Sequence, residues 1–400
     1  MNSNGKEKQM LLRAQVSLAL TLGMGILPAA AHAATITSSK TYHTTDVTVT
    51  EDVDIADGTI TVEGVDDDTS SQHANRTATL TGNVRIINPS DNVLTALSHG
   101  DGTQDWTGIL TVNPNGTKRV QLHGDILVGR PDNPPERGGY VNLYLSGRDS
   151  YFAGGIKDVT GNPPSTRGGV RLVLSNGATW YPKADSYTLA APADLGETGP
   201  ASDPNKPLGF HLSANGGAIN MAFAAPTTPR AAAAGQRTLT FTNTGASLNG
   251  ATFRISTDLT NGIADQVILN GVSSNNHYHL QVAYDPGMNA FPAETDYEIS
   301  HPSQIKIFES SNPNDTYDTP EYKTRKAVAA GLLQQDFTVR PTTTESQAGG
   351  KKTVYITKIA GRAMTPTDGP ALRAADLLMD MALAQLSAWR GENNDLHRRM

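Results

Sequence analysis

Two stretches of the chain, YLSGRDSYFAGG (residues 144–155) and VLSNGATWYPKA (residues 173–184), carry the pattern that decides the fold. Each begins with an apolar run ending in Leu-Ser, continues through a turn that contains Gly, and resumes with an aromatic residue. Gly and Asn suit tight turns because they accept backbone conformations that other residues resist. Loosely similar units that recur along a chain are compatible with a solenoid, in which each coil contacts only its neighbours.

The same kind of strand is expected from Thr44 to about Leu174. Short alternating apolar runs end in turns such as Asp57-Gly58, Asn115-Gly116 and Asn176-Gly177. The runs are short and show no hairpin regularity; they lie at residues 47–50, 59–62, 78–80, 84–87, 109–112, 120–122, 125–128, 141–145 and 170–174. Two architectures produce this pattern, an antiparallel sandwich or barrel and a parallel β-helix. Periodicity alone leaves both open.

Residues 185–236 interrupt the strand pattern with several prolines and the run Arg230-Ala-Ala-Ala-Ala-Gly235. Only Gly217 to Phe223 resembles a strand there, so we expect a large loop that leaves the β domain, or else an interdomain linker. From Thr238 the β pattern resumes more strongly, at residues 238–241, 251–255, 266–269 and 277–282.

Two features of these strands resemble the pertactin-like passengers of autotransporters. The units at 144–155 and 173–184 are similar to their L-x-x-G-A-x-W coils. FRISTDLTNGIADQVILNG…HYHLQVAYDPG, residues 253–287, is similar to their C-terminal passenger segment, through Asp258-Leu259, Gly262, Asp265, Val267 to Leu269, Gly271 and His279-Leu280. The resemblance implies an all-β fold: a right-handed parallel β-helix with a C-terminal β cap that nucleates folding. Strands near 305–308, 336–339 and 352–356 would complete that cap.

The N-terminus has the form of a Sec signal peptide. Lys6, Lys8 and Arg13 precede an apolar run at residues 19–27, and Ala31-His32-Ala33 follows. A basic region, a short apolar core and an A-x-A end predict cleavage between Ala33 and Ala34. The run is shorter than the roughly 20 apolar residues of a spanning helix, although an uncleaved anchor is the alternative. We therefore expect residues 1–33 to direct export.

Composition limits the classes of protein that fit. The chain has no Cys, so its stability depends on burial and hydrogen bonding without disulfides. Its formal net charge is −7, whereas a nucleic-acid-binding protein is expected to present a basic face. Only 6% of the residues are aromatic while Gly numbers 38, which favours short strands and tight turns over a helical bundle.

The C-terminal stretch from Pro370 to Met400 changes to a helical period. Its apolar residues recur at three- and four-residue steps, and no Gly or Pro lies between Ala371 and Arg390. AQLSAWRGENNDLHRRM, residues 384–400, resembles the junction where an autotransporter passenger enters a helix threaded through an outer-membrane β-barrel. The resemblance implies such a barrel as a partner outside this sequence. An ordinary helix docked on the β domain is the alternative; we expect an exposed or loosely docked helix with low order beyond Gly391.

Motifs for catalysis and for metal binding are scarce. The chain lacks Gly-Asp-Ser-Gly, Gly-x-Ser-x-Gly, His-Glu-x-x-His and phosphate-loop motifs. Asp66, Asp67 and Asp68 could offer oxygen ligands to Ca²⁺, but a solvated acidic turn explains them better. His277 and His279 share one face of a strand, as a metal pair would, but a polar face opposite Tyr278 and Leu280 also explains them. No cofactor and no metal site is predicted.

One processing site follows from the autotransporter resemblance. Some members free their passenger when an Asn side chain attacks its own main-chain carbonyl, and the pattern places Asn394 at that position with Asp395 after it. The family has Asn at both positions, so Asp395 is a departure. The alternative is an Asn that simply ends the helix near Gly391.

These observations predict four segments and a non-enzymatic function. The segments are a signal peptide (1–33), a β-helix passenger (34–236, with the loop region 185–236), a cap (237–362) and a helical linker (363–400). The resemblance implies a monomeric adhesin, displayed on or secreted from the outer membrane of a Gram-negative bacterium, that binds a host surface or extracellular-matrix ligand. An exported β-helix polysaccharide lyase or glycosidase is the alternative, and an antiparallel β-sandwich surface protein is a third.

Overall fold

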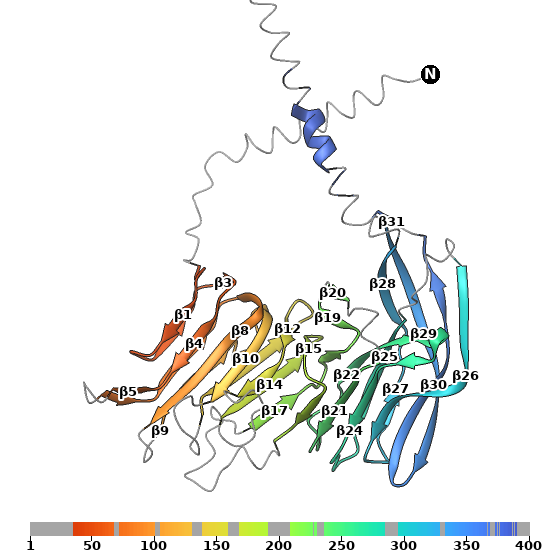
Figure 1. Ribbon diagram of the computed structural model, residues 1–400, viewed down its shortest axis with the longest axis horizontal. Coiled ribbons are helices and arrows are strands. Elements are labelled where there is room, and N and C mark those ends of the chain that lie inside the picture. Colours follow the sequence, from red (N-terminus) through yellow and green to blue (C-terminus); the bar gives the residue numbers. More distant parts are fainter. Residues whose placement is uncertain are drawn as a thin grey trace, which may run out of the picture.

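The structure, a computed structural model, is a β-solenoid of about six turns followed by one short helix (Figure 1). Successive coils stack along the long axis, from the N-terminal coils to the C-terminal cap. The described residues are 35–67, 72–100, 105–129, 138–158, 168–190, 209–226, 228–229, 236–284, 295–328, 333–365, 367–368 and, in the helix, 373, 375, 377–385, 387 and 389. The expected β-helix is therefore confirmed over the antiparallel sandwich.

Three faces make up each of the early coils, and every face is a parallel ladder. The first face contains β2 (Val47–Val49), β7 (Arg76–Leu80), β9 (Asp105–Val112), β11 (Tyr140–Ser146), β14 (Gly169–Ser175) and β17 (Gly209–Ser213). The second contains β3 (Val53–Ala56), the start of β8 (Val84–Gly100) and of β10 (Val120–Gly129), β12 (Tyr151–Gly154), β15 (Thr179–Pro182), β18 (Ala218–Asn220), β22 (Thr252–Asp258), β25 (His277–Tyr284) and β27 (Thr316–Asp318). The third contains β1 (Lys40–Tyr42), β4 (Ile60–Glu63), the ends of β8 and β10, and β13 (Ile156–Asp158).

Alternation of apolar residues explains why these strands form and which way they face. In β22 every second residue is buried, and in β14 Val170, Leu172 and Leu174 are buried while Arg171 and Val173 are partly exposed. Side chains at alternate positions point to opposite sides of a strand. The inward set therefore stacks on the equivalent residues of the next coil, as Leu143 does on Leu172.

The region 185–236 is more regular than the sequence predicts. It carries β16 (Ser186–Thr188), β17, β18 and a hairpin of β19 (Phe223–Ala225) and β20 (Thr228–Pro229). The expectation of a single strand there is wrong, because Phe210 and Leu212 of β17 are buried and continue the first face. The proline-rich residues 191–208 lie outside the described part of the chain.

The core is one continuous apolar column with an aromatic section in the middle. Trp180, which is fully buried, lies parallel to Phe152 of the preceding coil with ring centroids 6.4 Å apart. Tyr187 and Phe210 approach it edge-on at 4.9 and 5.6 Å. Aromatic rings in such offset and edge-on arrangements stabilise each other beyond the area they bury.

The C-terminal end of the solenoid is closed by an antiparallel sheet. β16, β21 (Thr238–Thr242), β24 (Gln266–Leu269) and β26 (Thr295–Ser310) pair in parallel. From β26 the direction reverses through β30 (Lys351–Ala363), β29 (Leu333–Ala348) and β28 (Tyr322–Val328). The expected cap is present, and the strands predicted at 305–308, 336–339 and 352–356 lie within β26, β29 and β30.

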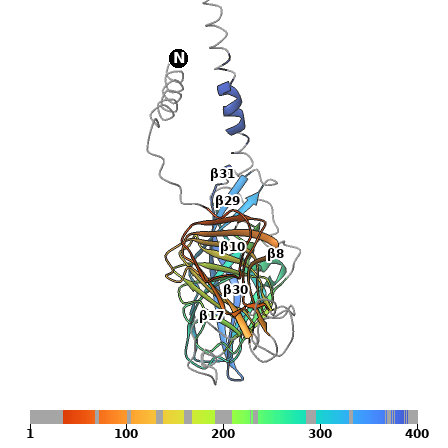
Figure 2. The same ribbon diagram turned by 90° about the vertical axis from the view of Figure 1, so that its left-hand side faces the viewer.

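The C-terminal helix stands apart from the β-sheets in both views (Figures 1 and 2). It is continuous over residues 377–385, and Leu377, Leu378 and Met379 are each more than 60% exposed. The expectation of an exposed helix is confirmed for these residues, whereas residues beyond Gly391 lie outside the described part. Among the described helical residues, none belongs to a helix with the length and hydropathy needed to cross a membrane.

Candidate functional site

A cavity of about 470 Å³ lies at one corner of the solenoid, where the second face turns into the third. Equivalent positions of successive coils line it: His123 to Asp125 after the first part of β10, Ala153 and Gly154 of β12, and Tyr181 to Lys183 at the end of β15. Phe223 and Ala224 of β19 and Gln236 to Thr238, at the start of β21, close the far side. The cavity therefore spans several coils.

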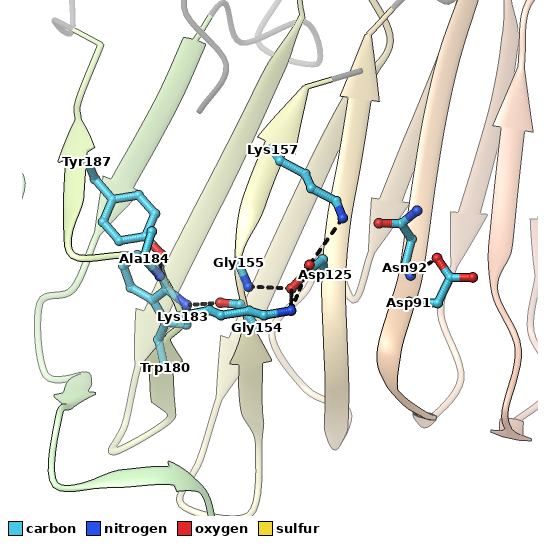
Figure 3. Close-up of polar contacts among 10 residues, drawn as sticks. All are labelled: Asp91, Asn92, Asp125, Gly154, Gly155, Lys157, Trp180, Lys183, Ala184 and Tyr187. Carbon is cyan, nitrogen blue, oxygen red and sulfur yellow. Dashed lines mark hydrogen bonds and ion pairs between the residues drawn. The ribbon is translucent and has the colours of Figure 1, made fainter. Parts of the chain in front are cut away.

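Asp125 is the centre of its polar wall (Figure 3). Its carboxylate accepts a hydrogen bond from the Gly155 main-chain N–H at 2.8 Å and lies 3.2 Å from Lys157 Nζ and 3.1 Å from Lys183 Nζ. The Asp125 side chain is only 9% exposed, whereas Lys183 is 59% exposed. A buried carboxylate thus pairs with two cations, of which Lys183 lines the cavity.

The surroundings set the charge of the two titratable groups beside the cavity. Burial alone would raise the pKa of Asp125, but the Gly155 N–H, Lys183 and Lys157 outweigh it and hold that pKa below its usual value. Burial and the positive charge of Lys183 both lower the pKa of His123. Asp125 is therefore ionised and His123 neutral at neutral pH.

A second carboxylate of the cavity is also paired. Asp185 accepts a hydrogen bond from Arg237 Nε, and Arg237 Nη2 donates to the Ala184 carbonyl oxygen at 2.5 Å. The general acid of a glycosidase is a carboxyl group with a raised pKa, whereas the pKa of Asp125 is lowered. Asp125 and Asp185 are both paired with cations, and the exposed Lys183 adds positive charge to this wall.

Hydrogen bonds to buried aromatic side chains hold the inner wall of the corner. The Trp180 indole Nε1–H donates to the Gly154 carbonyl at 3.2 Å, and the Ala184 N–H donates to the Tyr187 hydroxyl at 3.1 Å (Figure 3). On the outside, Tyr181 packs with Ala153 and Ala225 in a small apolar cluster beneath the β19–β20 hairpin. Binding residues placed on such fixed elements keep their geometry without a ligand.

The residues predicted for processing are not among those that form this site. Ala33, Ala34, Asn394, Asp395 and Asp68 lie outside the described residues, so those predictions stay as they are. Asp66 and Asp67 belong to β5 (Val65–Asp67), which pairs with β6 (Gln72–Ala74).

His277 and His279 share one face of β25, with Tyr278 and Leu280 buried on the other, as predicted. Sequence reasoning did not predict that the next coil places Asp318 opposite His279. It also missed the cavity, whose lining residues Asp125 and Lys183 come together, with Lys157 beside Asp125, only through the inter-coil register. Asp125 lies within β10 and Lys157 within β13, whereas Lys183 directly follows β15, so no shared local signal marks the three residues.

No protein-family model, no curated protein and no solved structure matches this chain, so the autotransporter resemblance remains a prediction.

Proposed function

We propose that this chain is the non-enzymatic passenger of an autotransporter, exported through its N-terminal signal and displayed at or released from the cell surface of a Gram-negative bacterium. Its role there is adhesion, through binding of a host-surface or extracellular-matrix ligand. The cavity at Asp125, with its two lysines and aromatic neighbours, provides one surface for such a ligand.

The observation that carries this proposal is the order of three elements: a parallel solenoid, an antiparallel cap and an exposed apolar helix. Leu377, Leu378 and Leu383 are 53–67% exposed, which is costly for a helix that has no partner. A helix that occupies a narrow channel would cover these side chains. The cap next to it would be the first part of the chain to fold outside.

Stepwise folding supports the same proposal. A chain that crosses a pore must be unfolded, and a solenoid can then form coil by coil because each coil needs only its neighbours. The absence of Cys removes any disulfide that could lock a bulky intermediate in an oxidising compartment.

Expression of residues 1–400, fused to an autotransporter barrel, in a Gram-negative host tests the proposal. We expect a mature N-terminus at Ala34 and a β domain that added protease reaches on intact cells. An uncleaved protein in the cytoplasm would reject export, and a protein shielded from protease until the outer membrane is opened would reject display.

The cavity favours one second candidate, an exported enzyme that acts on an acidic polysaccharide. Lys183 and Arg237 line the cavity and Lys157 contacts Asp125 beside it, which places positive charge along successive coils, where a polyanion could lie. A lyase produces an unsaturated sugar that absorbs ultraviolet light. The test is whether the intact protein forms that product from a polyuronate and whether Lys183→Met loses this activity. Both results together would reject the adhesin and support a lyase.

A further inference from the structure

The second face of the solenoid ends in a group of three side chains from two coils. β25 and β27 pair in parallel, with His277 opposite Thr316, Tyr278 opposite Tyr317 and His279 opposite Asp318. His277, His279 and Asp318 therefore project from the same side. Their side chains are 44%, 36% and 50% exposed, so solvent ions can reach them.

The distances within this group are short. His279 Nδ1 lies 2.7 Å from Asp318 Oδ1, and His277 Nε2 lies 3.8 Å from Asp318 Oδ2. The two imidazole centroids are 4.9 Å apart and nearly perpendicular. One potential ligand atom from each residue falls within 4.8 Å of the other two.

Thr316 contacts one ring nitrogen of His277 and leaves the other to face Asp318. The Thr316 hydroxyl oxygen lies 2.9 Å from His277 Nδ1 and 3.4 Å from the Asn276 carbonyl oxygen, so it can accept from Nδ1–H while it donates to that carbonyl. A proton on Nδ1 leaves the lone pair on Nε2, the atom nearer Asp318. Metal-binding histidines depend on such a partner at the other ring nitrogen, which sets the tautomer and the ring orientation.

We propose that His277, His279 and Asp318 bind one divalent transition-metal ion of the Zn²⁺ class. Two imidazoles and one carboxylate suit Zn²⁺ and its first-row neighbours, whereas Ca²⁺ and Mg²⁺ select oxygen ligands. Zn–N and Zn–O bonds of about 2.0–2.2 Å place tetrahedral ligand atoms about 3.3 Å apart. The potential ligand atoms lie within 4.8 Å of one another, so the widest pair has to close by up to about 1.5 Å, and side-chain rotation at these exposed positions supplies that movement.

The ion would join the last strand of the second face to the coil before it. β27 has three residues, and the chain between His279 and Asp318 includes all of β26. A metal bridge between the two coils therefore fastens the end of the solenoid where the cap begins. Three protein ligands leave a fourth position for water or for a group from outside the chain.

Zn²⁺ titration of the purified, chelator-treated full chain by calorimetry tests the site. We expect one tight equivalent per chain that Ca²⁺ and Mg²⁺ at a hundredfold excess do not displace. Co²⁺ should give the visible absorption of a tetrahedral complex. Zn²⁺ should also slow hydrogen exchange in residues 316–318, because a ligand that binds only the folded state opposes its opening.

Single variants distinguish this site from the other histidines. His279→Ala and Asp318→Asn should each weaken Zn²⁺ binding by at least tenfold, and Thr316→Val by about tenfold through the loss of the His277 partner. His43→Ala removes an exposed histidine outside these strands and should leave binding unchanged. Equal Zn²⁺ affinity in wild type, His279→Ala and Asp318→Asn overturns the proposal, as does displacement of Zn²⁺ by Ca²⁺ from the unmodified protein.

Discussion

Lys183 Nζ lies 3.1 Å from Asp125 Oδ2, although the two residues are 58 positions apart in the chain. Lys157, from the coil between them, reaches the same carboxylate oxygen at 3.2 Å. One buried carboxylate thus ties together three successive coils at the corner that holds the cavity. Asp125 therefore contributes both to the stability of the stacked coils and to the charge of the candidate site.

Asp125→Asn should lower the free energy of unfolding by about 1–2 kcal/mol at neutral pH. The amide keeps the shape but loses two charge-assisted contacts, and the exposure of Lys183 limits the cost through solvent screening. Denaturant unfolding measures the change. Asp54→Asn is the matched control: it breaks the Asp54–Arg85 pair, whose side chains are 55% and 45% exposed, and should cost less than about 1 kcal/mol. Equal losses in both variants would contradict the role of burial.

The contribution of Asp125 should depend on pH in one direction. Its folded pKa is below the unfolded value, so the stabilisation is complete above about pH 4 and is lost as the pH falls through the folded pKa. The difference in unfolding free energy between wild type and Asp125→Asn should therefore stay constant above about pH 4 and shrink as the pH falls from there to about pH 2. A difference that stays constant over this range would show that the carboxylate charge does not matter.

Asn113 should be needed for both its amide and its backbone conformation. Its φ is 54°, its side chain is buried, and its amide bonds to the Lys118 and Tyr144 carbonyls and to the Thr117 and Lys118 N–H groups, each at 3.0 Å. Asn113→Ala should cost about 2–4 kcal/mol, and Asn113→Gly about 1 kcal/mol less because Gly accepts a positive φ. Thermal and denaturant unfolding check both values. An Ala variant as stable as the Gly variant would show that the positive φ at this position carries no cost for Ala.

Trp180→Ala should be among the most damaging single changes in the core. It removes a fully buried ring that contacts Phe152, Tyr187 and Phe210, and such truncations cost about 3–5 kcal/mol. Trp389→Ala, at a position 63% exposed, should change the unfolding free energy by less than about 0.5 kcal/mol. Denaturant midpoints followed by circular dichroism compare the two, and similar shifts would argue against the buried aromatic column.

Leu378→Ser should leave the stability of the protein unchanged, and together with Leu383→Ser it should reduce transport to the surface. Leu378 is 67% exposed, so the free energy of unfolding should stay within about 0.5 kcal/mol of wild type, whereas Leu280→Ala in the core should cost about 2–5 kcal/mol. In the barrel fusion, Leu378→Ser together with Leu383→Ser should reduce surface display while the folded protein remains unchanged. Undiminished display would show that the apolar face of the helix is not needed for the proposed function.

Strand positions could be predicted from the sequence because alternation is a local property. The runs at 141–145 and 170–174 lie within β11 and β14, each of which extends one residue further at both ends. Which strands pair with each other could not be predicted. In a parallel ladder the pairing depends on the number of residues in each coil, and loops of variable size change that number. β17 was missed for this reason: the proline-rich segment before it resembles a loop, and its apolar residues are explained only by the coil beneath them.

The candidate sites differ in how much of them was predictable. The shared face of His277 and His279 follows from the two-residue period of one strand. Asp318 joins them only after the chain has passed through β26, and Asp125, Lys157 and Lys183 belong to three coils. Residues that meet across coils have no fixed spacing in the sequence.

The reversal of strand direction at β26 has a consequence for how the protein can vary in length. β26 pairs in parallel with β24 on one edge and antiparallel with β30 on the other, so a further coil added beyond it would meet strands that run the wrong way. Between β7 and β25, by contrast, each coil meets a parallel neighbour on both sides. Duplication or deletion of a coil there would leave both ends intact, so the reach of the molecule can be altered independently of its terminus.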